Sequence, residues 1–283
     1  MNLQDEVNRG VWSKTKATDW LARGQGFTDE GERHAYCTIM DQMRNAPILD
    51  IGVGPGRTIP MLRALTDRYV AIDYLPEMVE LARQRYPQTD IRVADARDLS
   101  GFDEASFALV TFSFMGIDAV DHEGRQRILR EVARVLRPGG TFWFSTLNKD
   151  GPAPRVRPWK PSLPSPSAGR GMYVLELFQA IKGMPRNIAN YNRLKAMSID
   201  SDGWSTGPFE AHRFGLVTHY TTLPNQLAEL IEAGFEAGPI VYGNDNGQLI
   251  RPSDPLHAEH SFTILARKKL STPTAPGASQ QSP

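Results

Sequence analysis

Glycines at every second position, and acidic residues at the ends of apolar runs, are the features of this sequence with the clearest chemistry. An apolar run carrying Asp50 leads into Gly52, Gly54 and Gly56. Glycine lets the backbone turn tightly and lets a ligand approach it closely. Asp73 ends the next apolar run, 17 positions after Gly56. In open α/β sheets an acidic residue at this place hydrogen-bonds the two hydroxyls of a ribose, although Asp73 taken alone could also be a surface carboxylate. The pattern predicts a nucleotide-type ligand.

The spacing of the glycines argues against a dinucleotide. A dinucleotide loop needs Gly-x-Gly-x-x-Gly, so that a pyrophosphate sits on the helix N-terminus. Counted from Gly52, the last glycine of that pattern is replaced by Arg57; counted from Gly54, Arg57 and Pro60 stand where glycines belong. An ordinary glycine turn after a strand is the alternative for this stretch alone.

Alternating strands and helices must position these residues. Short apolar runs predict strands at 48–51, 69–73, 91–96, 107–113 and 141–146, and helices are expected between them. The near-continuous apolar run at 107–113 is typical of a strand buried on both faces of a parallel sheet. The runs 239–242 and 261–267 predict two more strands, paired antiparallel.

The segment from Leu49 to Gly56 resembles the first motif of class I S-adenosylmethionine (SAM)-dependent methyltransferases. Residues 48–146 are similar, element for element, to the front two-thirds of that fold, and Arg137-Pro138-Gly139-Gly140 is one of its more specific marks. The resemblance, to members of small-molecule type, implies an α/β fold. It would be a doubly wound, seven-stranded, mostly parallel sheet with a mainly helical insertion after strand five.

The resemblance also implies a cofactor, SAM, with S-adenosylhomocysteine (SAH) as product. In the family an acidic residue after strand three meets the adenine amino group, and the backbone N–H of the next residue meets a ring nitrogen. The implied cofactor-binding residues are Asp50, Gly52, Gly54, Gly56, Asp73, Tyr74, Met78, Asp95, Ala96, Ser113 and Phe114.

Composition divides the chain into five parts. We expect an N-terminal arm and helix over the cofactor site (1–46), a SAM-binding core (47–150), an insertion or lid for the acceptor (151–214), the C-terminal part of the core sheet (215–270) and a disordered tail (271–283). The insertion should hold helices at 172–184 and 186–198. It carries nine Lys or Arg against four Asp or Glu, which is either a solvated basic face or a site for an anionic partner.

A general base, if the reaction uses one, should come from outside the cofactor motifs. The candidates are His219 and Tyr220, and Asp118, Asp121 and His122 after strand four. Each could equally cap a helix, because polar loop residues commonly do so. No metal is expected, since the pair His257 and His260 has no third ligand.

The balance of 32 basic and 32 acidic side chains argues against a broad nucleic-acid surface. The single cysteine, Cys37, excludes an intrachain disulfide, fits a reducing compartment and is expected to pack in the core. No signal peptide or membrane-spanning stretch is evident. We expect a cytoplasmic protein, monomeric or homodimeric, without a membrane or nucleic-acid partner.

The predicted function is methyl transfer from SAM to O, N or C of a small-molecule acceptor. The alternatives are a SAM-binding partner protein without catalysis, because binding motifs and chemistry are separable, and a nicotinamide-dependent oxidoreductase, which the glycine spacing disfavours. The motifs concern the cofactor only and do not identify the acceptor.

Overall fold

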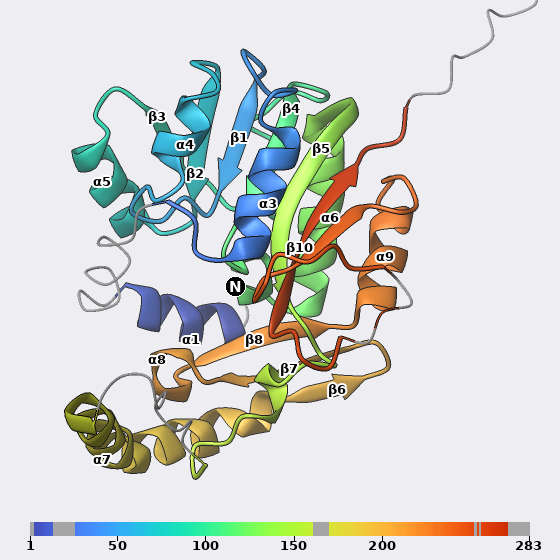
Figure 1. Ribbon diagram of the computed structural model, residues 1–283. Coiled ribbons are helices and arrows are strands. Elements are labelled where there is room, and N and C mark those ends of the chain that lie inside the picture. The colour runs from blue at the N-terminus through green and yellow to red at the C-terminus, as the bar shows by residue number, and fades with distance from the viewer. Residues whose placement is uncertain (1–2, 14–25, 161–169, 252–253, 255, 271–283) are drawn as a thin grey trace, which may run out of the picture.

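A seven-stranded sheet forms the centre of the protein, as predicted. The computed structural model describes residues 3–13, 26–160, 170–251, 254 and 256–270. The strand order is β3-β2-β1-β4-β5-β10-β9, with β10 antiparallel to β5 and β9 and the strands from β3 to β5 parallel (Figure 1). The strands are β1 (Ile48–Ile51), β2 (Tyr69–Asp73), β3 (Asp90–Val93), β4 (Phe107–Phe112), β5 (Leu136–Leu147), β9 (Ile240–Gly243) and β10 (Ser261–Arg267). The predicted tail, 271–283, lies outside the described residues.

Helices cover both faces of this sheet. On one face lie α3 (Glu30–Ile39), α4 (Ile59–Arg63) and α5 (Pro76–Arg85); on the other lie α6 (His122–Val135) and α9 (Leu223–Glu232). Each helix buries an apolar stripe against the strands, and each large side chain so buried contributes roughly 1.5–3 kcal/mol. The prediction that Cys37 packs in the core is wrong, because α3 turns Ala35 and Ile39 to the sheet and leaves Cys37 exposed.

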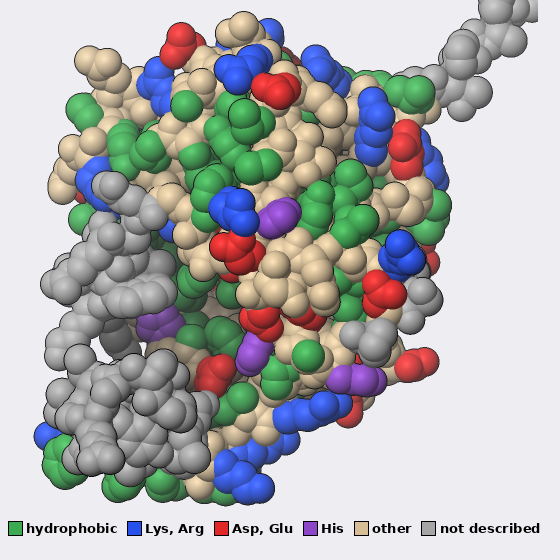
Figure 2. Space-filling model, in the orientation of Figure 1, with side chains coloured by type: hydrophobic (Ala, Val, Ile, Leu, Met, Phe, Trp, Pro, Cys, Tyr) green, Lys and Arg blue, Asp and Glu red, His purple; other side chains and the backbone are tan. Residues whose placement is uncertain are grey.

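A second, three-stranded antiparallel sheet lies beyond the carboxyl edge of the first, with the helix α1 (Leu3–Trp12) between them (Figure 1). Its strands are β6 (Ile199–Ser201), β7 (Trp204–Phe209) and β8 (Leu216–Thr221). Because β8 pairs with β7 along its whole length, the boundary predicted between 214 and 215 needs correction: 216–221 belong to the insertion's sheet. The surface is hollowed between the two sheets (Figure 2).

The rest of the insertion is mainly helical. A single helix, α7 (Arg170–Leu194), replaces the two predicted helices and runs through Pro185. A proline removes one helical hydrogen bond but does not always end the helix. A short helix, α8 (Ala211–Phe214), joins β7 to β8, and 3₁₀ turns lie at Ala153–Arg155 and Lys195–Met197. A further 3₁₀ turn, Gly116–Ala119, lies in the core between β4 and α6. No helix in the described ranges has the length and apolarity needed to cross a membrane.

Strand register brings the predicted site residues to one edge. Ile51 of β1 pairs with Ile72 of β2, and Asp73 pairs with Val93 of β3. The chain therefore leaves β1, β2 and β3 at the same level, where ligands bind in open α/β sheets. Strand three ends earlier than predicted, which places Asp95 in the following turn.

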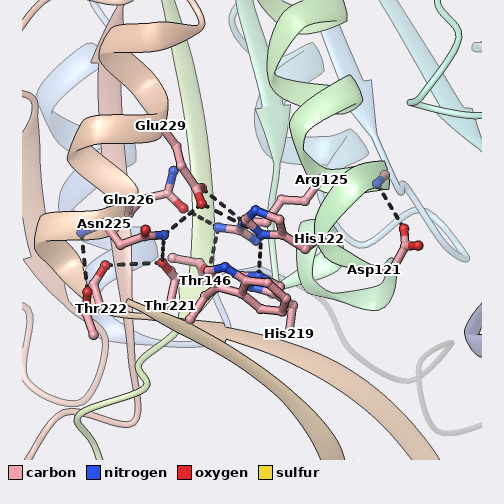
Figure 3. Close-up of polar contacts among 12 residues, drawn as sticks. Asp121, His122, Arg125, Thr146, His219, Thr221, Thr222, Asn225, Gln226 and Glu229 are labelled. Atoms are coloured by element: carbon pink, nitrogen blue, oxygen red, sulfur yellow. Dashed lines mark hydrogen bonds and ion pairs between the residues drawn. The ribbon is translucent and has the colours of Figure 1, made fainter. Parts of the chain in front are cut away.

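A buried polar network fastens the second sheet to the core (Figure 3). Arg125 of α6 is fully buried and forms an ion pair with Asp118. Asp118 also accepts hydrogen bonds from the hydroxyl of Thr146 at 2.8 Å and the backbone N–H of Leu147 at 2.7 Å, both at the end of β5. Arg125 further donates to Gln226 of α9. Removing one partner of such a buried pair is strongly destabilising, because the other charge stays buried and unpaired.

Two stacked histidines extend this network to the second sheet. His122 of α6 lies flat against Trp204 of β7, with ring centroids 4.1 Å apart. Its Nδ1 lies 3.2 Å from Nε2 of His219 on β8. Burial, and then the positive charge of Arg125, lower the pKa of His219 well below its usual range. The fold therefore keeps the imidazole of His219 neutral.

This geometry predicts an acid-sensitive contribution to stability from His219. As pH falls through the ordinary histidine pKa near 6.5, the unfolded chain binds a proton that folded His219 does not, so folding loses free energy. Between about pH 7.5 and 5.5 the loss should be about 1.4 kcal/mol for one such group. We expect His219→Gln to lack this increment in urea unfolding measured at both pH values.

The matched control is His257→Gln, which removes an exposed imidazole and should keep the wild-type pH dependence. An equal loss of unfolding free energy in wild type and His219→Gln would contradict the assignment of the acid sensitivity to His219.

Candidate functional site

The three glycines of the loop after β1 all have left-handed backbone conformations, but they serve different purposes. A Cβ at Gly52 would lie 2.7 Å from the Phe112 ring, and one at Gly56 would lie 2.6 Å from the Tyr86 ring. These two positions require glycine for packing as well as for φ. A Cβ at Gly54 would meet no atom within 4 Å, and Gly54 lines a cavity. Gly54 is thus the glycine at which a ligand can approach the backbone.

Asp50 holds this loop in position through hydrogen bonds and does not line the cavity. Its side chain is fully buried and accepts hydrogen bonds from the hydroxyls of Thr58, Tyr69 and Thr111, the last two at 2.7 Å. Burial raises the pKa of Asp50, while the three hydroxyl donors act in the opposite direction. Direct cofactor contact by Asp50 is therefore corrected to positioning: it joins β1, β2 and β4 to the start of α4.

Asp73 combines both roles. One carboxylate oxygen accepts the N–H of Gly54 at 2.9 Å and the other accepts the N–H of Leu75 at 2.9 Å. The side chain is buried, which raises the pKa of Asp73 to about 6, and it lines the cavity. Each carboxylate oxygen has more than one acceptor position, so Asp73 can still accept hydrogen bonds from a ligand's hydroxyls.

The turn after β3 forms the next part of the wall. Asp95 and Ala96 both line the cavity. The guanidinium of Arg97 contacts Asp95 at 2.6 Å and Asp5 of α1 at 2.6 Å, which ties the N-terminal helix to this turn. Burial raises the pKa of Asp95, but the hydrogen bonds from Arg97 outweigh it and leave the pKa lowered.

These parts enclose a cavity of about 500 Å³, within the range of small-molecule sites. The cofactor half is formed by the loops after β1, β2, β3 and β4. The residues of the other half, here named the acceptor half, come from α1, the segment after β4, the end of β5, and β7, α8 and β8 of the insertion. They are Asn8, Trp12, Met115, Gly116, Ala119, Val120, Leu147, Phe209, Ala211, His212, Leu216 and Thr218.

Most of the predicted cofactor residues line this cavity. Those in its wall are Gly52, Gly54, Asp73, Tyr74, Met78, Asp95, Ala96, Ser113 and Phe114. Asp50 and Gly56 are not in the wall. They act behind it, Asp50 through hydrogen bonds to three hydroxyls and Gly56 through its close approach to Tyr86.

None of the predicted catalytic residues lines the cavity. Asp121 caps α6 by accepting the N–H of Gly124. Asp118, His122 and His219 belong to the network that docks the second sheet, and Tyr220 lies in a small cluster with Leu147 and Ala153. Successive side chains of a strand point to opposite faces. On β8 the cavity face carries Leu216 and Thr218, so His219 points away from it.

Arg57 and His212 are two of the cavity residues that were not predicted. Arg57, noted only as a departure from the dinucleotide pattern, donates to Glu32 at 2.7 and 2.8 Å and to the Ser113 hydroxyl at 2.9 Å. His212 enters the wall from α8 in the insertion. No local signal identifies His212, because its place depends on how the second sheet docks.

The cofactor half fits SAM. Open space beside the Gly54 backbone can take a ligand's polar chain, and Asp73 stands at the end of β2 with acceptor positions for two ribose hydroxyls. The apolar Met78 and Ala96 border the space that a flat base would need. Within the described ranges no three His, Cys, Asp or Glu side chains are grouped so that they could hold a metal ion.

Similarity to known proteins agrees with this site. Residues 48–140 match the family model described as a methyltransferase domain. The chain is 34% identical over 118 residues to a ubiquinone biosynthesis O-methyltransferase of Xanthomonas oryzae pv. oryzae, covering 40% of this chain and 48% of that protein. It is 35% identical over 119 residues to the protein of that name from Xanthomonas campestris pv. campestris, with the same coverage. The matches thus span about half the length of these relatives.

Solved structures extend the likeness to nearly the whole fold. The Burkholderia thailandensis 1,6-didemethyltoxoflavin-N1-methyltransferase, determined with bound 1,6-didemethyltoxoflavin and SAH, has a TM-score of 0.56 at 16% identity, covering 95% of this chain and 92% of that one. A possible histamine N-methyltransferase from Thermotoga maritima has a TM-score of 0.55 at 15% identity, covering 93% and 99%. With the strand order and the glycine loop, these findings show that the chain carries a methyltransferase domain at residues 48–140, within the fold of class I SAM-dependent methyltransferases.

Proposed function

We propose that this protein transfers the methyl group of SAM to an O, N or C atom of a small-molecule acceptor. One observation carries the proposal: a single cavity joins the cofactor half to a second half formed by α1 and the insertion. A bound cofactor would occupy the first half and leave the second for an acceptor. The names of the relatives, which include an O-methyltransferase and an N-methyltransferase, support small-molecule chemistry without identifying the acceptor.

The chain's own residues would bind, orient and exclude water. SAM, when bound, supplies a methyl group on a cationic sulfur that leaves as a thioether. Asp73 and the Gly54 loop would fix the nucleoside, so that an acceptor atom held in the second half lies in line for transfer. The apolar lining of that half would keep water away from the reacting atoms.

A SAM-binding protein without catalysis remains the alternative function. It would share the cofactor half, and it differs only in what the acceptor half does. Incubation with SAM and candidate acceptors, followed by mass spectrometry for SAH and methylated product, separates the two. A nicotinamide-dependent enzyme would instead bind NAD, which calorimetry detects directly.

One prediction of this proposal concerns Asp73. We expect the protein to bind SAM and SAH but not NAD in calorimetry. Asp73→Ala should lower SAH affinity by around 10- to 150-fold, because hydrogen bonds to a charged acceptor are worth roughly 1.5–3 kcal/mol. Asp73→Asn, which keeps one acceptor oxygen, should fall between wild type and Asp73→Ala. Since Asp73 also holds the N–H groups of Gly54 and Leu75, the ligand-free variants should also melt at lower temperature.

The control is Asp103→Ala, which removes an exposed carboxylate that does not line the cavity. This variant should bind SAH as wild type does. Unchanged SAH affinity in Asp73→Ala would remove the ribose assignment, and NAD binding without SAM binding would end the methyltransferase proposal.

Another prediction separates ligand contact from packing in the glycine loop. Gly52 and Gly54 both have positive φ, +66° and +53°, so alanine at either position costs about 1–2 kcal/mol of backbone strain. Only at Gly52 does the added Cβ also clash with Phe112. We expect Gly52→Ala to lower the melting temperature more than Gly54→Ala does.

SAH affinity, measured under conditions in which the variants are equally folded, should fall in Gly54→Ala. Gly54→Ala places its Cβ in the cavity and should weaken SAH at least about tenfold, which is 1.4 kcal/mol. Wild-type SAH affinity in a folded Gly54→Ala protein would show that the cofactor does not approach this part of the loop.

A further inference from the structure

None of the described side chains assigned to the acceptor half of the cavity is charged; Asp5 of α1 also lines the cavity, but it is paired with Arg97 in the turn after β3. It presents aromatic and aliphatic walls, with Trp12 from α1, Met115 after β4 and Phe209 from β7. A ligand group carrying a full charge would lose its water there without gaining a partner, which is strongly unfavourable. The shape and polarity of this half therefore suit an uncharged, largely apolar molecule.

Three polar side chains lie in this half, and they differ in what they can do. The amide of Asn8 already donates to the carbonyls of Ala119 at 2.7 Å and Val217 at 2.8 Å, and it accepts the N–H of Val217 at 3.0 Å. Thr218 offers a hydroxyl, which is a poor base. Among the described residues of the acceptor half, His212 alone can take up a proton near neutral pH.

A ring contact holds His212 in place and leaves its ring nitrogens available to a ligand. Its ring meets Trp12 edge-on, with centroids 4.6 Å apart and planes at 70°. Neither ring nitrogen forms a hydrogen bond with the residues that the structure describes. Burial, with no contribution from a neighbouring charge, lowers the pKa of His212. A neutral imidazole with an available lone pair therefore lines the cavity.

The backbone at this place is strained. His212, Arg213 and Phe214 are successive non-glycine residues with φ of 50°, 61° and 57°. Each costs about 1–2 kcal/mol relative to an ordinary helical conformation. Across the same cavity, Phe114 and Met115 also have left-handed φ, both 54°. Such outliers gather at ligand sites, where the surrounding structure holds a side chain in a required position.

We propose that His212 is the general base of the reaction and that the acceptor is an uncharged aromatic molecule bearing a hydroxyl group. The inference rests on the proposed methyl transfer and narrows its acceptor. A bond forms between the acceptor oxygen and the methyl carbon, and the carbon–sulfur bond breaks with its electron pair passing to sulfur. The hydroxyl proton passes to a ring nitrogen of His212, and the resulting imidazolium later releases it to water.

A binding experiment tests the placement of His212 independently of turnover. The probes are 2-naphthol, 2-methoxynaphthalene, which lacks the hydroxyl proton, and 6-hydroxy-2-naphthoate, which adds a charge. Fluorescence titrations are made with and without saturating SAH. Wild type should bind 2-naphthol at least about fivefold more tightly than 2-methoxynaphthalene, which lacks the hydrogen-bond donor. It should also bind 2-naphthol more tightly than 6-hydroxy-2-naphthoate, because the carboxylate would lose its water without gaining a partner.

Two variants separate a base from a structural residue. His212→Gln keeps a hydrogen-bond acceptor and should keep the preference for 2-naphthol over 2-methoxynaphthalene. His212→Leu should lose that preference. With SAM present, wild type should form 2-methoxynaphthalene from 2-naphthol, and both variants should lose 10²- to 10⁴-fold in kcat, the usual contribution of a general base. In His212→Gln the KM for 2-naphthol should change only a few-fold.

The outcomes distinguish this inference from the proposed function. SAH affinity should stay within about twofold of wild type in both variants, and His257→Gln should behave as wild type throughout. Failure of wild type to bind SAM or SAH would end the proposed function itself. Wild-type kcat in His212→Gln, an unchanged hydroxyl preference in His212→Leu, or absence of product from wild type and 2-naphthol would overturn the role of His212 or the acceptor class.

Discussion

The buried carboxylate of Asp50 is the interaction on which the rest of the site depends. It accepts three hydroxyl hydrogen bonds, from Thr58 before α4, Tyr69 of β2 and Thr111 of β4. A carboxylate removed from water is tolerated only when its acceptor positions are filled. This requirement fixes three strands and the start of a helix around one point. The glycine loop, which spans from Asp50 to Thr58, is therefore held at both ends and presents Gly54 to Asp73.

A second buried charge fixes the other half of the cavity. Arg125 joins α6 to the Gly116–Ala119 turn, the end of β5 and α9, and the stacked pair of His122 and Trp204 carries the contact to the second sheet. An ion pair buried in this way adds little net stability over apolar packing, but losing either partner is costly. The second sheet is thus confined to positions that keep these partners together, and this sets the distance between the two halves of the cavity.

The N-terminal helix closes the cavity between these two parts. Asp5 pairs with Arg97 of the core, while Gln4 and Asn8 bond the backbone of Val217 on β8. The same helix brings Trp12 against His212. The cavity wall therefore combines residues of α1, the core loops and the insertion, which lie far apart in the sequence. All three are needed to enclose a ligand.

Local pattern was enough to predict the main sheet, the glycine loop and most of the cofactor half. Strand and helix periods, together with the rule that parallel strands end at one edge, carry Gly54, Asp73 and Asp95 to the same place whatever the rest of the chain does. The sequence could not show which of Asp50 and Asp73 would line the cavity, because both lie at the ends of apolar runs. Only the packing of the neighbouring strands places Asp73 in the cavity wall and Asp50 behind it. It also could not separate Thr218 from His219. Alternation says that they point to opposite faces of β8, but the docking of the second sheet on Arg125 decides which face meets the cavity, and the same docking brings His212 to the acceptor half.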